Sequence, residues 1–99
     1  MPYSLSYFDD VRIDIQNAKA WYKQRRPGLE KRFAEAIKTA LLKLKQNPLA
    51  HELKYKNIRV AHPKTFPYGI HFYIDDTQQQ IVVVAIVHHR RNPNTSQKR

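Results

Sequence analysis

Apolar and polar residues alternate at the start of the chain and then recur at helical spacing. Residues 3–8 place three apolar side chains on one face, which predicts a short strand. Asp9 and Asp10 follow and can cap a helix, because carboxylates accept the free N–H groups of its first turn. The next apolar residues predict an amphipathic helix over roughly residues 10–25: Val11, Ile15, Ala18 and Tyr22.

A second helix is predicted directly after Pro27-Gly28, a pair that ends helices and opens turns. Its apolar stripe runs from Leu29 to Leu44 at helical spacing, and Asn47-Pro48 ends it. Lysines and glutamates lie off the stripe and are expected to form a solvated face. Because so few residues separate the two helices, they should pack as an antiparallel hairpin.

Three strands are predicted in the second half of the chain. They cover residues 55–62, 66–75 and 81–88. Pro67 lies inside the second of these runs, which suggests a bulge or an edge position there. The third run is apolar on both faces, which is typical of a strand inside a sheet.

Together these elements predict an α+β domain in the order β-α-α-β-β-β. Its sheet is expected to be antiparallel, with the helical hairpin packed on one face. The other face is then open to solvent. The alternation of side chains places Arg59, His71 and Tyr73 on that open face, and the last strand ends there at His88.

Length and composition narrow the class of protein. The chain has 99 residues and no cysteine, which suits one domain without disulfides or thiolate zinc sites. We expect a single domain over residues 1–93 and a flexible basic tail over residues 94–99. No apolar run approaches the length of a membrane span, and the N-terminus lacks a signal-peptide pattern. A cytoplasmic protein without a membrane partner is therefore expected.

The charge balance points to an anionic partner. Lys and Arg number 18 against 8 Asp and Glu, which gives a formal net charge of +10. Such a field around a small domain favours polyanions or an acidic partner protein. All five histidines, the side chains that titrate near neutral pH, lie in the second half of the chain.

The most distinctive group of polar residues is His88-His89-Arg90-Arg91, directly after the last strand. RNA cleavage without a metal needs a base, an acid and cations for the phosphate. His88 or His71 can act as acid or base, Arg59 and Arg90 can hold phosphate, and Tyr73 can stack on a base. The alternative interpretation is a polar strand end with solvated arginines.

Metal and cofactor sites are not expected. His88 and His89 are adjacent, so on a strand they point to opposite faces and do not readily share one ion. No HxH or HExxH pattern occurs, and the chain has only two glycines, too few for a phosphate-binding loop. Trp21 and Tyr22 lie at helical spacing with apolar neighbours and are interpreted as packing residues.

Several segments, in this order, resemble the RelE/ParE toxin superfamily of bacterial type II toxin–antitoxin modules. They cover about residues 3–93, nearly the whole chain. After the first strand they read DIQNAKAWY, RRPGLEKRF, NPLAHE, IRVAHPKTFPYGIHFYID and VVVAIVHHRRNP. The resemblance implies a growth-arresting toxin that a small acidic or partly disordered antitoxin neutralises, with a role in plasmid stabilisation. The fold of that superfamily agrees with the element order predicted above.

Two activities occur in the superfamily. ParE-like members inhibit DNA gyrase, whereas RelE-like members cleave mRNA on the ribosome without a metal. The helical hairpin and the closing AIVHHRR look closer to ParE. The lysines that RelE-like enzymes use are matched only loosely by Lys54 and Lys56, and Glu52 is the only carboxylate near them.

Gyrase inhibition is therefore favoured, with ribosome-dependent mRNA cleavage as the alternative. A basic nucleic-acid-binding domain without toxicity is the third interpretation. The candidate catalytic residues, should the protein be a ribonuclease, are the following: His88, His71, Arg59, Arg90 and Tyr73. The candidate binding surface for the target is a basic set: Lys54, Lys56, Arg59, His89, Arg90 and Arg91.

Overall fold

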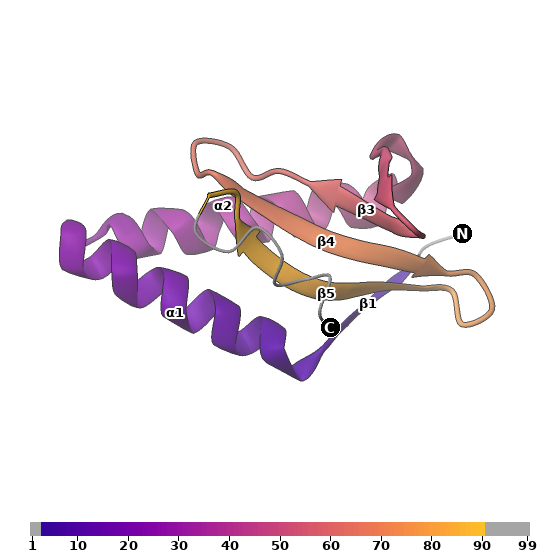
Figure 1. Ribbon diagram of the computed structural model, residues 1–99, viewed down its shortest axis with the longest axis horizontal. Coiled ribbons are helices and arrows are strands. Elements are labelled where there is room, and N and C mark those ends of the chain that lie inside the picture. Colours follow the sequence, from indigo (N-terminus) through magenta and orange to yellow (C-terminus); the bar gives the residue numbers. More distant parts are fainter. Residues whose placement is uncertain (1–2, 91–99) are drawn as a thin grey trace.

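The computed structural model describes residues 3–90, which form one layer of sheet beside one layer of helices (Figure 1). The expected α+β class, with a helical hairpin on one face of the sheet, is confirmed. In chain order the elements are β1 (Ser4–Tyr7), α1 (Asp9–Arg25), α2 (Leu29–Gln46), the 3-10 helix η1 (Pro48–Ala50), β2 (Leu53–Tyr55), β3 (Ile58–Ala61), β4 (Tyr68–Asp75) and β5 (Gln80–His88). Among these residues no helix has the length and apolar character needed to cross a membrane.

The helical hairpin forms where the sequence predicts it. Gly28 turns the chain between α1 and α2 with φ +97°, a left-handed conformation that glycine adopts without steric cost. Its N–H donates to the Glu30 carboxylate at 2.8 Å, which satisfies one free donor at the start of α2. Asp9 and Asp10 lie inside the first turn of α1, and the preceding Phe8 makes no side-chain cap. They therefore favour the helix through its dipole and not as caps.

The sheet has five strands in the order β1-β5-β4-β3-β2. The expectation of an all-antiparallel sheet is wrong at one edge, because β1 pairs in parallel with β5. Antiparallel neighbours follow from tight hairpins, whereas parallel neighbours need a long connection. The helical hairpin and the remaining strands supply that connection between β1 and β5. As a result β5 has partners on both edges, as its apolar sequence predicts.

Two strand boundaries differ from the expected ones. The predicted strand over residues 55–62 is the hairpin of β2 and β3, which turns at Lys56 with φ +46°. β4 begins at Tyr68 and not at Phe66, since Pro67 has no N–H to donate to a neighbouring strand. The Pro67 carbonyl still accepts a hydrogen bond from the His89 N–H at 3.0 Å, which ties the two strand ends together.

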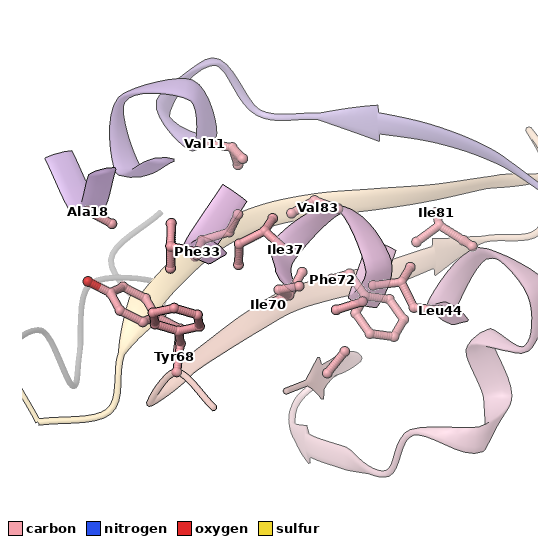
Figure 2. Close-up of a cluster of buried hydrophobic side chains, with 14 of the residues drawn as sticks. Val11, Ala18, Phe33, Ile37, Leu44, Tyr68, Ile70, Phe72, Ile81 and Val83 are labelled. Atoms are coloured by element: carbon pink, nitrogen blue, oxygen red, sulfur yellow. The ribbon is translucent and has the colours of Figure 1, made fainter. Parts of the chain in front are cut away.

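The main core fills the space between the helices and the sheet (Figure 2). At its centre the ring of Phe33 packs against Tyr22, Phe66 and Tyr68, with centroid distances of 5.0–5.3 Å. Trp21 and Tyr22 belong to this layer, which confirms that they are packing residues. The largest fully buried side chains of the core come from both layers: Val11, Phe33, Leu44, Ile70, Phe72, Ile81 and Val83.

A bulge in β5 decides which side chains face the helices. His71 pairs with Ala85 and Phe72 with Val83, so Val84 is an extra residue on β5. Before the bulge, the odd-numbered residues of β5 face the helices. After it, the even-numbered residues do, and Ile86 joins the main core while Val87 joins a second cluster on the opposite face.

Candidate functional site

A pocket of about 200 Å³ lies at the end of β5, where the sheet meets the β2–β3 hairpin. We call it the histidine pocket. Its polar character comes from four histidines, one lysine and one tyrosine. His88 reaches the pocket from the helix-facing side of the sheet, and the other three imidazoles lie with Lys54 and Tyr55: His62, His71 and His89. The floor is apolar and comes from Val60 and Val87, which lie on the face of the sheet away from the helices.

His71 is the most constrained of the three imidazoles. Its Nδ1 and the Tyr55 hydroxyl lie 3.2 Å apart in a hydrogen bond. Its ring also packs over Gly69, where an added Cβ would meet Nε2 at 3.3 Å and the Val60 side chain at 2.9 Å. Burial lowers the pKa of His71 to about 4, helped by the positive His62, His89 and Lys54. At neutral pH this imidazole is uncharged, so it can accept a proton but has none to spare as an acid.

The other two imidazoles lie side by side at the rim of the pocket. The rings of His62 and His89 have centroids 5.0 Å apart. Nδ1 of His62 donates to the Tyr68 main-chain carbonyl at 3.3 Å, which orients the ring. Partial burial, followed by the charges of His62 and Lys54, lowers the pKa of His89.

The chemistry open to this pocket is limited. Among the described residues no carboxylate lines it, and Glu52, the carboxylate expected nearby, is not part of its wall. Across residues 3–90, no group of three or more His, Asp or Glu side chains is arranged to hold a metal ion. Imidazoles beside one lysine can bind an anion or a hydrogen-bond donor. Any acid–base chemistry in this pocket would depend on its histidines.

The prediction that Arg59 shares a face with His71 is wrong. In the antiparallel register Arg59 pairs with Phe72 and Val60 with His71, so Arg59 faces the helices. Its guanidinium donates to the His51 main-chain carbonyl. His51 itself packs edge-on against Phe72, in the layer that the helices cover.

His88 is also on the helix-facing side, because the bulge at Val84 reverses the alternation of β5. It pairs with Tyr68, and the two rings meet edge to face with centroids 5.1 Å apart. The Arg90 N–H donates to Nδ1 of His88 at 3.1 Å. His88 reaches the wall of the histidine pocket from this side, so it lines the same pocket as His71.

The remaining candidate residues lie apart from one another along the sheet. Tyr73 lies on the face of His71, as predicted, but it packs on the second apolar cluster and does not line the pocket. Lys56 is exposed at the turn between β2 and β3, and Arg90 is exposed after β5. Arg91 and the expected tail over residues 94–99 lie outside the described residues.

The partial burial of His71 predicts a loss of stability in mild acid. Its folded pKa is below the ordinary value of 6.5, so between pH 6.5 and pH 4 the unfolded chain takes up a proton that the folded protein does not. The stabilisation is complete above pH 6.5 and falls as the pH drops towards 4. Because the ring is partly exposed, we expect about 1–2 kcal/mol in the free energy of unfolding.

Urea unfolding of the wild type and of His71→Asn at pH 7.0 and pH 4.5 checks this. The asparagine amide keeps a partner for Tyr55 but does not titrate. The variant should therefore lose less stability than the wild type over this interval. Equal losses in the two proteins would show that His71 carries none of the effect.

Sequence patterns did not predict a second feature, an apolar groove formed by β1, α1 and α2. One cavity of about 560 Å³ lies between the end of β1 and the start of α1, and another of about 310 Å³ lies between β1, α1 and α2. They share Tyr7, Ile15 and Lys19, so they form one continuous groove. Tyr7 and Leu42 in its walls are 46% and 52% exposed, which is unusual for apolar side chains of this size.

The sequence also did not reveal the role of Asp14 between α1 and β5. The carboxylate of this residue accepts a hydrogen bond from the Ile86 N–H at 3.0 Å. β1 ends beside Val83, so no strand among the described residues pairs with this edge of β5 beyond that point. Asp14 supplies the acceptor there and fixes α1 against the sheet.

Comparison with known protein structures places the fold. The chain is similar to a protein of the chromosomal ParDE toxin–antitoxin system from P. aeruginosa, with a TM-score of 0.76 and 14% identity, covering 87% of this chain and 95% of the other. It is also similar to a chain of the toxin–antitoxin complex RelBE2 from Mycobacterium tuberculosis, with a TM-score of 0.62 and 18% identity, covering 89% and 99%. At these identities the likeness concerns the fold.

The sequence itself identifies the family. A comparison with curated protein sequences gave no match. The family model for the ParE toxin of the type II toxin–antitoxin system parDE matches residues 7–93, from the end of β1 past the end of β5. That span includes both helices, the histidine pocket and the closing basic residues. The chain belongs to the ParE toxin family of type II toxin–antitoxin systems.

Proposed function

We propose that this toxin arrests growth by binding and inhibiting DNA gyrase. The observation that carries the proposal is the position of Arg59, the candidate phosphate-binding residue. His71 and His88 both reach the histidine pocket, but Arg59 does not line it, and its guanidinium donates to the His51 main-chain carbonyl instead. A metal-free ribonuclease needs its acid, its base and its phosphate-binding cations around one reacting phosphate. An inhibitor that acts by docking needs only a surface.

The gyrase-binding surface in this proposal is the basic end of the sheet around the histidine pocket. Lys54 and His89 line the pocket, Lys56 and Arg90 follow them closely in the chain, and all four are exposed. We leave Arg59 out because its guanidinium is turned toward His51. Clustered exposed cations raise the rate at which a protein finds an anionic partner surface, and they restrict the orientation in which it docks.

A supercoiling assay with gyrase from the host organism tests the proposal. The purified toxin should block supercoiling of relaxed plasmid. Lys54→Glu combined with Lys56→Glu should weaken the inhibition about tenfold or more, because two attractive charges become repulsive. Lys23→Glu combined with Lys45→Glu makes the same charge change on α1 and α2, away from the pocket, and should inhibit nearly as well as the wild type.

His88→Ala separates this function from RNA cleavage. The ring of His88 packs on Tyr68, so its removal should cost some stability but leave gyrase inhibition in place. Cells that express the toxin should show no codon-positioned cuts when translated mRNA is mapped by primer extension. Such cuts, lost in His88→Ala, would overturn gyrase inhibition as the primary activity. Unaffected growth would instead favour a non-toxic nucleic-acid-binding domain.

One observation supports mRNA cleavage as the second candidate function. The neutral His71 beside Lys54 can take a proton from a ribose hydroxyl while the lysine neutralises a phosphate. In that case His89 or His62, at the rim, would have to supply the leaving-group proton. The primer-extension arm of the same experiment decides between the two functions.

We further propose that the apolar groove holds a segment of the cognate antitoxin. Its walls come from β1, α1 and α2, and Arg12, Lys19 and Lys38 line it beside the apolar side chains. Within residues 3–90, β1 is also an edge strand with pairing on one side only, and strand addition is a common mode of peptide binding at such an edge. An acidic amphipathic segment matches both the apolar floor and the cationic rim of this groove.

A further inference from the structure

A third cavity, of about 260 Å³, lies between α2 and the segment that links β3 to β4. Arg32, Thr39 and Lys43 line it from α2, where their spacing of seven and four positions places them on one side of the helix. Lys64 and Thr65 line it from the linking segment. The cavity thus brings together three cations and two hydroxyl groups from two separate elements.

The charge in this cavity is strongly unbalanced. Among the described residues that line it, Glu35 is the only acid, against Arg32, Lys43 and Lys64. These three cations are exposed to solvent, so each keeps its donors available for a ligand. A concave cationic surface that also carries hydroxyl donors is suited to phosphate oxygens, which accept hydrogen bonds in several directions.

The linking segment is held in a defined shape. Pro63 and Phe66 are buried at its two ends, and Phe66 packs on Tyr22 and Phe33 with centroid distances of 5.1 and 5.3 Å. Thr65, between them, has φ +78°, a conformation that is rare and costly for a β-branched residue. The two buried anchors impose this conformation, and Lys64 and Thr65 face α2 across the cavity as a result.

The cavity adjoins the histidine pocket at one residue. His62 lines both of them. The cations along this path are Lys43, Arg32 and Lys64 on one side of His62 and Lys54 on the other. We call this path the basic track. Successive charges along a surface match the regular spacing of phosphates along a nucleic-acid backbone better than they match a single small anion.

We propose that the basic track binds the sugar–phosphate backbone of duplex DNA. This inference rests on the proposed function, because an inhibitor of gyrase meets its target on DNA. Readout of single-stranded RNA or DNA needs exposed aromatic rings on which bases stack. The aromatic ring in this cavity, Phe66, is only 9% exposed and packs into the core. The part of the track beside α2, where Arg32, Lys43 and Lys64 lie, can therefore hold a backbone, and its described residues offer no exposed Phe, Tyr or Trp ring for unpaired bases.

Fluorescence anisotropy with the full chain and a labelled duplex of about 20 base pairs tests the inference. The track variant replaces Arg32, Lys43 and Lys64 by glutamine. The matched control replaces Lys23, Arg26 and Lys45, exposed residues that line neither cavity, and it removes the same charge. The track variant should bind duplex DNA about tenfold or more weakly than the control. Its plot of log affinity against log salt should flatten by about 2–3 units of slope.

Three results would overturn the inference. Equal losses in the track and control variants would mean that net charge alone causes binding. Tighter binding of a single-stranded RNA of the same length would assign the track to RNA. If the wild type does not bind the duplex, duplex DNA is not the ligand of the basic track. Circular dichroism spectra should match for all three proteins, because every substituted residue is exposed.

The same preparations separate this inference from the proposed function. Wild-type protein that blocks gyrase but does not bind duplex DNA would overturn the DNA track and leave gyrase inhibition standing. Protein that binds DNA through the track but does not block gyrase would overturn the proposed function alone. If both hold, the track variant should also inhibit gyrase more weakly than the control variant at equal concentration.

Discussion

Replacing Phe33 by alanine is expected to lower the free energy of unfolding by about 3–5 kcal/mol, the cost of removing a large buried ring. Phe33 is fully buried, and its ring contacts three other aromatic rings from α1, the linking segment and β4. The surrounding side chains come from both layers, so they cannot all move into the space left behind. A domain of this size has about 5–15 kcal/mol of net stability in total, so the loss is severe.

Urea denaturation monitored by the single tryptophan measures this effect. Trp21 packs beside Tyr22, the neighbour of Phe33, so its fluorescence should report the loss of the core. Leu42→Ala is the control on the same helix. Its side chain is 52% exposed, so we expect a change of no more than about 0.5 kcal/mol. Similar losses in the two variants would mean that the core is not centred on Phe33.

The elements of this fold follow from local sequence patterns, but their arrangement at the edges does not. The helical hairpin was predictable because its apolar stripes are continuous and Pro27-Gly28 separates them. β5 was predictable because it is apolar on both faces. The parallel direction of β1 was not, since alternation along a strand is the same whichever way its neighbour runs. The turn at Lys56 could not be predicted either, because lysine does not typically occupy the left-handed position of a turn.

In the candidate site, local sequence patterns also failed to predict which face of the sheet some side chains occupy. Strict alternation from Val82 and Val84 would place His88 on their face, together with His71. One extra residue in β5 shifts every later side chain to the opposite face. Arg59 was misplaced for a related reason, since only the register against β4 decides which face of β3 is covered. His71 and Tyr73 were placed correctly because no bulge interrupts β4 between them.

Lys38→Glu combined with Leu42→Glu is expected to weaken binding of the cognate antitoxin about a hundredfold or more, the range of a strong interface position. Both residues line the apolar groove, and they are four positions apart on α2, so they present one continuous surface. The first substitution opposes an acidic partner with a like charge. The second places a charge where the partner must bury apolar surface. Glutamate keeps good helix propensity, so α2 should remain folded.

Titration calorimetry with the antitoxin measures the affinity, and the chain offers a matched control. Lys45→Glu combined with Leu49→Glu makes the same two changes at the same spacing, at positions outside the groove, where Leu49 is 65% exposed. This control should bind the antitoxin within a few-fold of the wild type, as expected for substitutions outside the interface. Equal weakening in both variants would assign the effect to net charge, and wild-type affinity in the groove variant would place the antitoxin elsewhere. In cells, only the groove variant should stay toxic when the antitoxin is co-expressed, because its target-binding surface is untouched while its neutralisation fails.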